Sequence, residues 1–219
     1  MALSSEIRAV LPPETALAWE RILPLVPACA YLAGGTAIAV QLLHRVSRDL
    51  DFFLAEPVDL LQLAADLGGI GDFAPTLLTA DTLNGMLDRV KLQFLLTAQQ
   101  RVLEPLLEIG GLRVAGLGDL LATKLQAVAG RGELRDYFDL MTIERQAGRM
   151  VEEGLALAIA RYQPEVPDQM VVSMVRALGY FGDVADDPGL PVSRVTIERY
   201  WRRRQPVIVR HLDRYQGYE

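Results

Sequence analysis

Two aspartates on either side of one leucine are the residues of this 219-residue chain best placed to do chemistry. Asp49 and Asp51 belong to the segment DLDFF, which otherwise reads as a buried strand. Alternate side chains of a strand share a face, so both carboxylates should project to one side while Leu50 and Phe52 turn to the core. Two carboxylates this close repel unless a cation separates them, and Mg²⁺ prefers oxygen ligands. By itself such a pair is more common on an exposed strand or edge turn than at a metal, so the Mg²⁺ interpretation depends on what precedes it in the chain.

A glycine pair upstream could supply the other half of a nucleotide site. Gly34 and Gly35 follow the apolar run ACAYLA, and Thr36 opens a predicted helix. Because glycine lacks a Cβ, backbone N–H groups at a helix start can approach a phosphate there, aided by the helix dipole. Mg²⁺ keeps positions for phosphate oxygens, so the two features together predict a nucleoside triphosphate site with Thr36 as a hydroxyl donor. The glycine spacing matches neither the Rossmann nor the P-loop pattern.

A second group of charged residues lies in residues 116–140, GLGDLLATKLQAVAGRGELRDYFDL. Asp136 and Asp139 are three apart on a predicted helix and share a face. Only two of the 22 basic residues are lysines, and one of them, Lys124, lies among leucines of a predicted helix. Its compact charge suits one phosphate oxygen, but it could equally form an ion pair with Asp136 or Asp139. The residues alone leave both interpretations open.

Both segments resemble a known family. Residues 34–53, GGTAIAVQLLHRVSRDLDFF, look like the signature of the AbiEii-type nucleotidyltransferase toxins, in the DNA polymerase beta-like nucleotidyltransferase superfamily. That signature is a GG[ST] turn followed by RxSxDLDF; a second pattern is an acidic residue, a lysine five positions on, and RDxxDL. The resemblance covers roughly residues 28–145. The matching residues are Gly34, Gly35, Thr36, Arg45, Ser47, Asp49, Leu50, Asp51 and Phe52, then Asp119, Lys124, Arg135, Asp136, Asp139 and Leu140.

The resemblance implies an enzyme that moves a nucleotidyl group from an NTP to an acceptor hydroxyl. It implies the toxin of a bacterial toxin–antitoxin pair, with tRNA or another RNA end as acceptor and a cognate antitoxin as partner. Asp49 and Asp51 would hold Mg²⁺, and Asp49, Asp51, Lys124 and Asp136 would be catalytic, with Arg135 and Asp139 in support. The residues expected to bind the NTP are Gly34, Gly35, Thr36, Arg45, Ser47, Lys91 and Lys124.

One position departs from the superfamily pattern. A third carboxylate usually lies on a later strand, but the expected strand RVKLQFL, residues 89–95, carries Gln93 there. An amide cannot accept a proton or balance a second Mg²⁺ as a carboxylate does. Either one metal suffices, or Asp136 or Asp139 takes over, or the enzyme is weakened. Lys91, on the same face as Gln93, could contact the nucleotide or pair with Asp49.

Two other functions stay open for this reason. One is a non-catalytic nucleotide- or protein-binding module with a degenerate site, and the other is a nucleotidyltransferase acting on a small molecule.

The elements that must position these residues predict an α+β protein. The pattern of elements predicts a small mixed sheet over residues 1–116, for which the resemblance implies a nucleotidyltransferase fold, then a helical domain over 117–219 that contributes Lys124 and the RDxxD segment. The expected strands are 28–33, 50–54, 76–83, 86–96 and 112–115, with a hairpin turn at Asn84-Gly85. The expected helices are two within 4–24, then 36–43, 58–67, 118–129, 134–146, 152–162, 168–181, and 192 onward with a break at Pro206.

Composition narrows the class of protein. The net charge of −6 argues against a basic protein that coats nucleic acid, and no DNA duplex is expected as a partner. A single cysteine, Cys29, excludes an intramolecular disulfide framework, and two histidines leave little for a His-rich metal site. Neither a membrane-spanning run nor a signal peptide is apparent, so we expect a cytoplasmic protein.

The last part of the sequence has a different charge balance. Residues 194–214 carry seven arginines and two acidic residues, a local excess of five positive charges. Helical spacing predicts that Tyr200 or Trp201 anchors this segment while some of Arg202, Arg203 and Arg204 stay exposed. Such arginines could hold an RNA acceptor or an acidic protein partner, or could simply be solvated.

Overall fold

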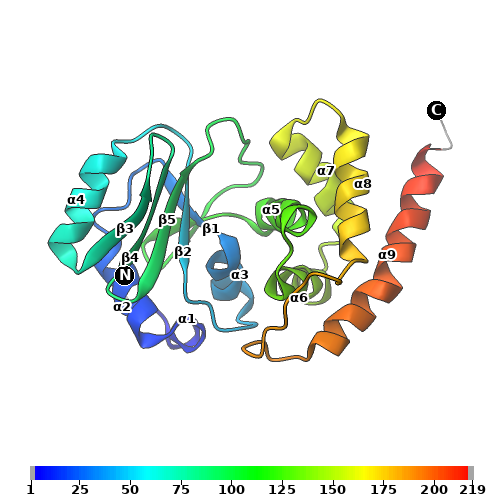
Figure 1. Ribbon diagram of the computed structural model, residues 1–219, viewed down its shortest axis with the longest axis horizontal. Coiled ribbons are helices and arrows are strands. Elements are labelled where there is room, and N and C mark those ends of the chain that lie inside the picture. The colour runs from blue at the N-terminus through cyan, green and yellow to red at the C-terminus, as the bar shows by residue number, and fades with distance from the viewer. Residues whose placement is uncertain (1–2, 217–219) are drawn as a thin grey trace. The chain divides into compact units, whose positions relative to one another are not determined.

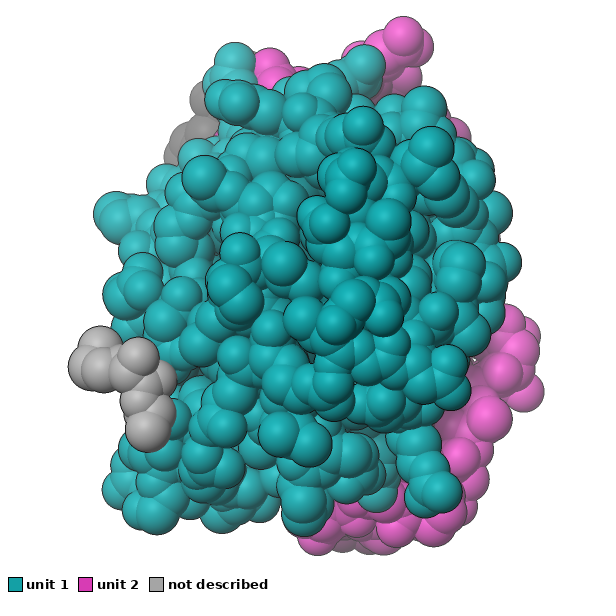
Figure 2. Space-filling view, turned by 90° about the vertical axis from the view of Figure 1, so that its left-hand side faces the viewer, with its two compact units in different colours: residues 1–116 teal, residues 117–219 magenta. Residues whose placement is uncertain are grey.

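The structure is a computed structural model that describes residues 3–216. The chain divides into two compact units, unit 1 comprising residues 1–116 and unit 2 residues 117–219 (Figures 1 and 2). Unit 1 contains a β-sheet with four helices, and unit 2 is helical. Across residues 3–216, no helix has both the length and the apolar character required to cross a lipid bilayer.

The sheet of unit 1 is mixed and has seven strands in the order β3-β4-β5-β2-β1-β7-β6. Strand β2 runs antiparallel to β1 and parallel to β5, and β1 runs parallel to β7. The remaining neighbours are antiparallel. This confirms the predicted α+β class with a mixed sheet. The strands are β1 (Ala30–Ala33), β2 (Leu50–Leu54), β3 (Phe73–Leu78), β4 (Thr82–Leu87), β5 (Val90–Leu96), β6 (Leu107–Ile109) and β7 (Leu112–Val114).

The central strands bury one face by strict alternation. In β2, Leu50, Phe52 and Leu54 are fully buried, whereas Asp51 and Phe53 are partly exposed. Phe52 stacks on Phe94 of β5 with ring centroids 4.9 Å apart. The alternation confirms that Leu50 and Phe52 face the core, and it fixes Asp51 on the opposite face, because a slip of one residue would exchange the two sets.

Four helices accompany the sheet, and α3 is the one that continues directly from a strand (Figure 1). Their bounds are α1 (Ser5–Val10), α2 (Pro13–Ile22), α3 (Gly34–Leu42) and α4 (Leu60–Ile70). Helix α3 packs on β1 and β2, and α4 packs on β3 and β4. Helix α3 begins at Gly34, two residues before the predicted start at Thr36. Helix α4 continues through Gly68 and Gly69, past the predicted end at residue 67.

The predicted hairpin turn at Asn84-Gly85 is wrong. Both residues lie inside β4, and the turns fall at residues 79–81 and 88–89 instead. A Cβ on Gly85 would come within 2.5 Å of the Phe73 ring on β3, so the glycine provides room for an aromatic side chain to cover the strand. Here tertiary packing, rather than turn chemistry, requires the glycine.

Strand β6 was not predicted. It is three residues long and forms a hairpin with β7 around Gly110 and Gly111, which have φ values of 56° and 83°. These left-handed conformations favour glycine, so the glycine pair was the available sequence signal. Trp19 of α2 donates a hydrogen bond from Nε1 to the Gly110 carbonyl at 3.0 Å, which ties this turn to the rest of unit 1.

Unit 2 is built around helix α5 (Leu117–Gly130), which packs against α6 (Leu134–Thr142), α7 (Val151–Tyr162) and α8 (Pro167–Leu178). Gly154 of α7 allows close packing, because a Cβ there would lie 2.6 Å from Leu121. Two fully buried charges also join these helices, since Arg161 Nη1 lies 2.6 Å from Asp119 Oδ1. Removal of either partner would leave an uncompensated charge in the core.

Helix α9 (Arg194–Gln216) closes the unit and packs on α6, α7 and α8. Its predicted break at Pro206 is wrong, because the helix continues through the proline. Trp201 and Ile208 on either side are fully buried, and Trp201 Nε1 donates to the Tyr137 carbonyl at 3.0 Å. Packing of both flanking turns therefore outweighs the hydrogen bond that proline removes. The sequence predicted Tyr200 or Trp201 as the anchor, and Trp201 is the fully buried one.

Candidate nucleotide site and a buried lysine cluster

Asp51 lies against the glycine that begins helix α3. Gly34 has φ 65°, and a Cβ built on it would lie 2.5 Å from Asp51 Oδ2. Any other residue at position 34 would therefore need both a left-handed backbone and the space held by the carboxylate. Residue 33, which precedes the helix, makes no side-chain capping hydrogen bond, and the Asp51 carboxylate lies next to the first turn.

The second glycine faces a different pair of side chains. A Cβ on Gly35 would contact the guanidinium of Arg45 and lie 3.5 Å from Ser47 Oγ. The loop before β2 thus folds back over the helix start and brings Arg45 and Ser47 of the RxSxDLDF motif to the GG turn. The geometry places these motif residues together in unit 1.

Thr36 holds that loop in place. Its hydroxyl is buried, lies 2.7 Å from Ser47 Oγ and also bonds the Asp49 carbonyl oxygen. Ser47 N donates to the Val10 carbonyl at 2.9 Å, which ties the loop to the end of α1. The single hydroxyl proton of Thr36 is therefore engaged within the protein, and its observed contacts position Asp49 rather than extend outward.

The donor set around the DLD motif suits Mg²⁺. Asp49 directly precedes β2 and is partly exposed, as is Asp51 within the strand. In the stretch that the structure describes, no three His, Cys, Asp or Glu side chains gather closely enough to hold a metal by themselves. Mg²⁺ is commonly bound by one or two carboxylates together with water and substrate phosphates. Asp49 and Asp51 are two such carboxylates, one just before β2 and one within it.

Gln93 occupies the position predicted for a third carboxylate. It pairs with Asp51 across β2 and β5, and with Asn84 across β4 and β5, so the three side chains form a row on one face of the sheet. Sequence reasoning missed Asn84, whose buried Oδ1 accepts no hydrogen bond among the residues described. Lys91, two residues before Gln93, is exposed and has no ion pair with Asp49 in the described chain.

Lys124 is enclosed by the two carboxylates of the RDxxD segment. Its Nζ lies 2.6 Å from Asp136 Oδ1 and 2.9 Å from Asp139 Oδ2, and all three side chains are buried in unit 2. Burial alone would lower the pKa of Lys124, but Asp139 and Asp136 outweigh it and raise the pKa above 10.5. The ion pair considered from the sequence is present, with both aspartates, and the lysine is a fixed positive charge.

Asp136 also caps its own helix. Its Oδ2 accepts a hydrogen bond from Glu133 N at 3.1 Å while Oδ1 bonds Lys124, so both oxygens have donors. This is a capping box at the start of α6. Arg135 turns away to the surface, where it pairs with Glu133. Asp136 is therefore arranged to hold Lys124 and the helix end rather than to accept a further proton.

Solved structures resemble this chain in fold. JHP933 from Helicobacter pylori has a TM-score of 0.55 and 19% identity, with 98% of this chain and 97% of that chain covered. MenT4, a nucleotidyltransferase toxin from Mycobacterium tuberculosis, has a TM-score of 0.60 and 18% identity, with 94% and 86% covered.

Sequence comparison identifies a relative and a family. The protein aq_aa25 of Aquifex aeolicus is 29% identical over an alignment of 193 residues that covers 84% of this chain and 87% of that protein. The family described as nucleotidyl transferase AbiEii toxin, type IV toxin–antitoxin system, matches residues 18–214, which include the GG turn, the DLD motif and the lysine cluster. The chain therefore belongs to the AbiEii family of nucleotidyltransferase toxins.

Proposed function

We propose that this protein is a Mg²⁺-dependent nucleotidyltransferase that moves a nucleoside monophosphate from an NTP to a hydroxyl at an RNA end, with tRNA as the foremost acceptor. Family membership supports the coarser activity, a nucleotidyltransferase toxin of a toxin–antitoxin system. The observation that carries the finer proposal is the close approach of Gly34 to Asp51, which brings a potential metal ligand to an uncapped helix start.

The start of α3 would bind the triphosphate. Gly34 and Gly35 add no Cβ to the first turn, and the helix dipole would favour a phosphate there. Arg45 lies against Gly35 and would add a guanidinium to the same phosphates. Thr36 and Ser47 would act indirectly, because their hydrogen bonds hold the loop that carries Asp49.

Asp49 and Asp51 would hold Mg²⁺ beside these phosphates. Bound there, the ion would neutralise charge on the phosphate oxygens during attack at the α-phosphorus and departure of pyrophosphate. Asp51 is held in the sheet by the β1–β2 and β2–β5 pairing, so its carboxylate is fixed before the substrate arrives.

In unit 2, Asp136 and Asp139 already bond the buried ammonium of Lys124, so its contact with a nucleotide phosphate stays a prediction. Because both aspartates already bond the ammonium, neither is well suited to replace the missing third carboxylate. Gln93 therefore leaves one Mg²⁺ as the simplest arrangement. Exposed Lys91, on the same face as Gln93, is free to approach a phosphate.

Transfer of radiolabel tests the proposal. The purified protein is incubated with each α-labelled NTP, bulk bacterial tRNA and either Mg²⁺ or a chelator, and RNA is resolved after RNase or mock treatment. We expect RNase-sensitive label that requires Mg²⁺ and disappears in Asp51→Asn, whose circular dichroism should match wild type. Label that survives RNase would indicate a small-molecule acceptor. Tight Mg²⁺–NTP binding without transfer would favour the non-catalytic module that Gln93 allows.

A further inference from the structure

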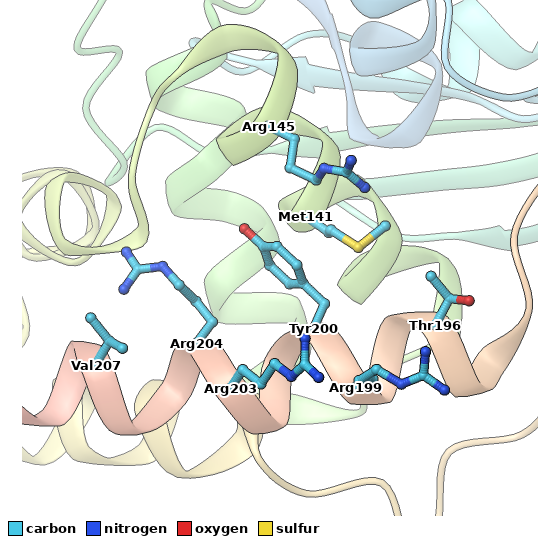
Figure 3. Close-up of a pocket in the computed structure, with 8 residues that line it drawn as sticks. All are labelled: Met141, Arg145, Thr196, Arg199, Tyr200, Arg203, Arg204 and Val207. Carbon is cyan, nitrogen blue, oxygen red and sulfur yellow. The ribbon is translucent and has the colours of Figure 1, made fainter.

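Unit 2 contains a cavity of about 370 Å³ between helix α9 and the end of α6 with its π-helical turn η1 (Ile143–Ala147) (Figure 3). Met141, Val207 and the ring of Tyr200 give it an apolar lining. Arg145 enters from the π-helical turn, and Arg199 and Arg203 enter from α9. The volume falls within the range of small-ligand sites, and the lining combines apolar surface with several cationic groups.

The carboxylates of Glu144 and Glu152 near this cavity bond Arg204 and Tyr200. Buried Glu144 bonds Arg204 at 3.0 Å and accepts the hydroxyl hydrogen bond of Tyr200 at 2.5 Å. Glu152 also pairs with Arg204. Of the three consecutive arginines 202–204, Arg204 is therefore engaged within the protein, whereas Arg202 and Arg203 are exposed. Tyr200 is held so that its ring, rather than its hydroxyl, is presented to the cavity (Figure 3).

The other three arginines keep their charge uncompensated. Arg145, Arg199 and Arg203 are exposed, and none forms an ion pair or hydrogen bond with any described carboxylate. The π-helical turn separates the two roles, because Glu144 is buried within it while the next residue, Arg145, is exposed at the cavity. Single π-helical turns occur frequently at functional sites.

A second hollow continues along the same helix. It measures about 250 Å³ and shares Arg199 and Arg203 with the first, adding Arg202 and Val195. Glu198 in its wall is already paired with Arg194 and Arg202. Two adjoining hollows that share two arginines suit a ligand with successive phosphates rather than an isolated anion.

We propose that these hollows bind a single-stranded segment of RNA, with one base in the larger cavity and its phosphates on Arg145, Arg199 and Arg203. Guanidinium groups bind phosphate oxygens through paired hydrogen bonds, and aromatic rings provide stacking surface for bases of any sequence. An acidic peptide could pair with the arginines, but its acidic residues carry no planar ring that could stack on Tyr200. In RNA, every phosphate is accompanied by a base. The choice of RNA rests on the proposed function, which this surface would serve by holding the acceptor.

Fluorescence anisotropy with a short mixed-sequence single-stranded RNA tests the inference in the full chain, without NTP or metal. In Arg199→Gln/Arg203→Gln, affinity should fall roughly tenfold, and the slope of log affinity against log salt should shrink by about 0.7 for each phosphate that is no longer neutralised. The matched control is Arg176→Gln/Arg210→Gln, which removes the same charge from exposed positions of unit 2 outside both hollows. The control should keep wild-type affinity and slope.

Three results would overturn the inference. The first is unchanged RNA affinity and slope in the Arg199/Arg203 variant. The second is an equal loss of affinity in the control variant, which would reduce the effect to net charge. The third is a variant that no longer binds a labelled polyglutamate peptide but still binds RNA, which would assign the surface to an acidic protein. Because the assay needs no transfer, a failure here is distinguishable from a failure of the labelling experiment, which tests the activity alone.

Discussion

Gln93 lies directly beside Asp51 in the register of the parallel strands β5 and β2. Neighbouring strands are about 4.8 Å apart, so the two side chains project from the same face within reach of one bound ion. A carboxylate at position 93 would complete a three-oxygen-ligand edge at this point of the sheet. The amide of Gln93 provides an oxygen but no negative charge, so it would bind a metal ion more weakly than a carboxylate.

Restoring the carboxylate should strengthen metal binding. In Gln93→Glu we expect Mg²⁺ affinity, measured by isothermal titration in the presence of an NTP, to rise on the order of tenfold. Gln99→Glu makes the same chemical change at an exposed position after β5 and should leave the affinity unchanged. Equal Mg²⁺ affinity in Gln93→Glu and wild type would show that the ion does not bind beside Asp51.

Gly34→Ala should abolish NTP binding. The new Cβ would require the space of the Asp51 carboxylate, and the left-handed backbone would add strain of about 1–2 kcal/mol. Gly148→Ala is a matched control, because Gly148 has φ 67° and no atom within 4 Å of the added Cβ. Gly148→Ala should lose only the stability that the backbone strain costs, Gly34→Ala should lose more because of the contact with Asp51, and only Gly34→Ala should lose NTP affinity in titration. Retained NTP binding by Gly34→Ala would remove the helix start from the site.

Replacing Lys124 should cost stability as well as activity. Lys124→Met leaves Asp136 and Asp139 buried without their cation, so the free energy of unfolding at pH 7 should fall by about 3–5 kcal/mol. The only other lysine of the chain, Lys91, is exposed, and Lys91→Met should change stability by less than about 0.5 kcal/mol. Urea unfolding of both variants makes this comparison. Similar stabilities would show that the cluster contributes little to the fold.

The same cluster predicts behaviour in alkali. The folded pKa of Lys124 is raised above its ordinary value of 10.5, so the ammonium contributes fully below pH 10.5 and its contribution disappears as pH rises through the folded pKa. Wild type should therefore lose stability above pH 10.5 more steeply than Lys124→Met. Parallel stability curves for the two proteins over that range would contradict the assignment.

Glu152 should govern part of the stability in acid. Burial alone would raise the pKa of Glu152, but hydrogen bonding to Arg204 outweighs it and lowers the pKa below 4.5. This stabilisation is present above pH 4.5 and is lost as pH falls through the depressed folded pKa. Glu152→Gln should lose about 2 kcal/mol at neutral pH and flatten the acid limb of the stability curve. Glu153→Gln, at a more exposed neighbour, should lose less than about 1 kcal/mol. A Glu152→Gln curve parallel to that of wild type would contradict this role.

Local patterning predicted the parts of the fold that local chemistry determines. The alternation in LDFFL predicted β2 with its bounds, and helical spacing predicted the helices of both halves. Asn84-Gly85 was misread because the same dipeptide can form a turn or admit a neighbouring ring, and only the position of Phe73 decides between them. Strand β6 was too short to show alternation. Pro206 was misread because burial of Trp201 and Ile208 depends on helices distant in sequence.

The sequence indicated which residues form the candidate site, but it did not indicate the hydrogen bonds and ion pairs between them. The spacing of Asp49 and Asp51 indicated metal ligands, and that assignment stays a prediction. No sequence pattern could show that Thr36 bonds the Asp49 carbonyl, that Asp136 divides its oxygens between Lys124 and a helix cap, or that Arg204 is neutralised by Glu144. Each of these contacts joins residues whose proximity arises only after the chain has folded.

The position of Asn84-Gly85 within β4 should slow deamidation of Asn84. An asparagine before glycine loses its amide readily when the glycine nitrogen can swing onto the side-chain carbonyl, and asparagine is among the thermolabile residues. In the strand both backbones are held by pairing with Gln93 and Leu92, so the reaction requires the sheet to open. Each molecule that opens and deamidates would carry a new acid next to Gln93, in the row that contains Asp51. Deamidation of Asn84 would thus add one negative charge beside the predicted metal ligands in each molecule whose sheet has opened.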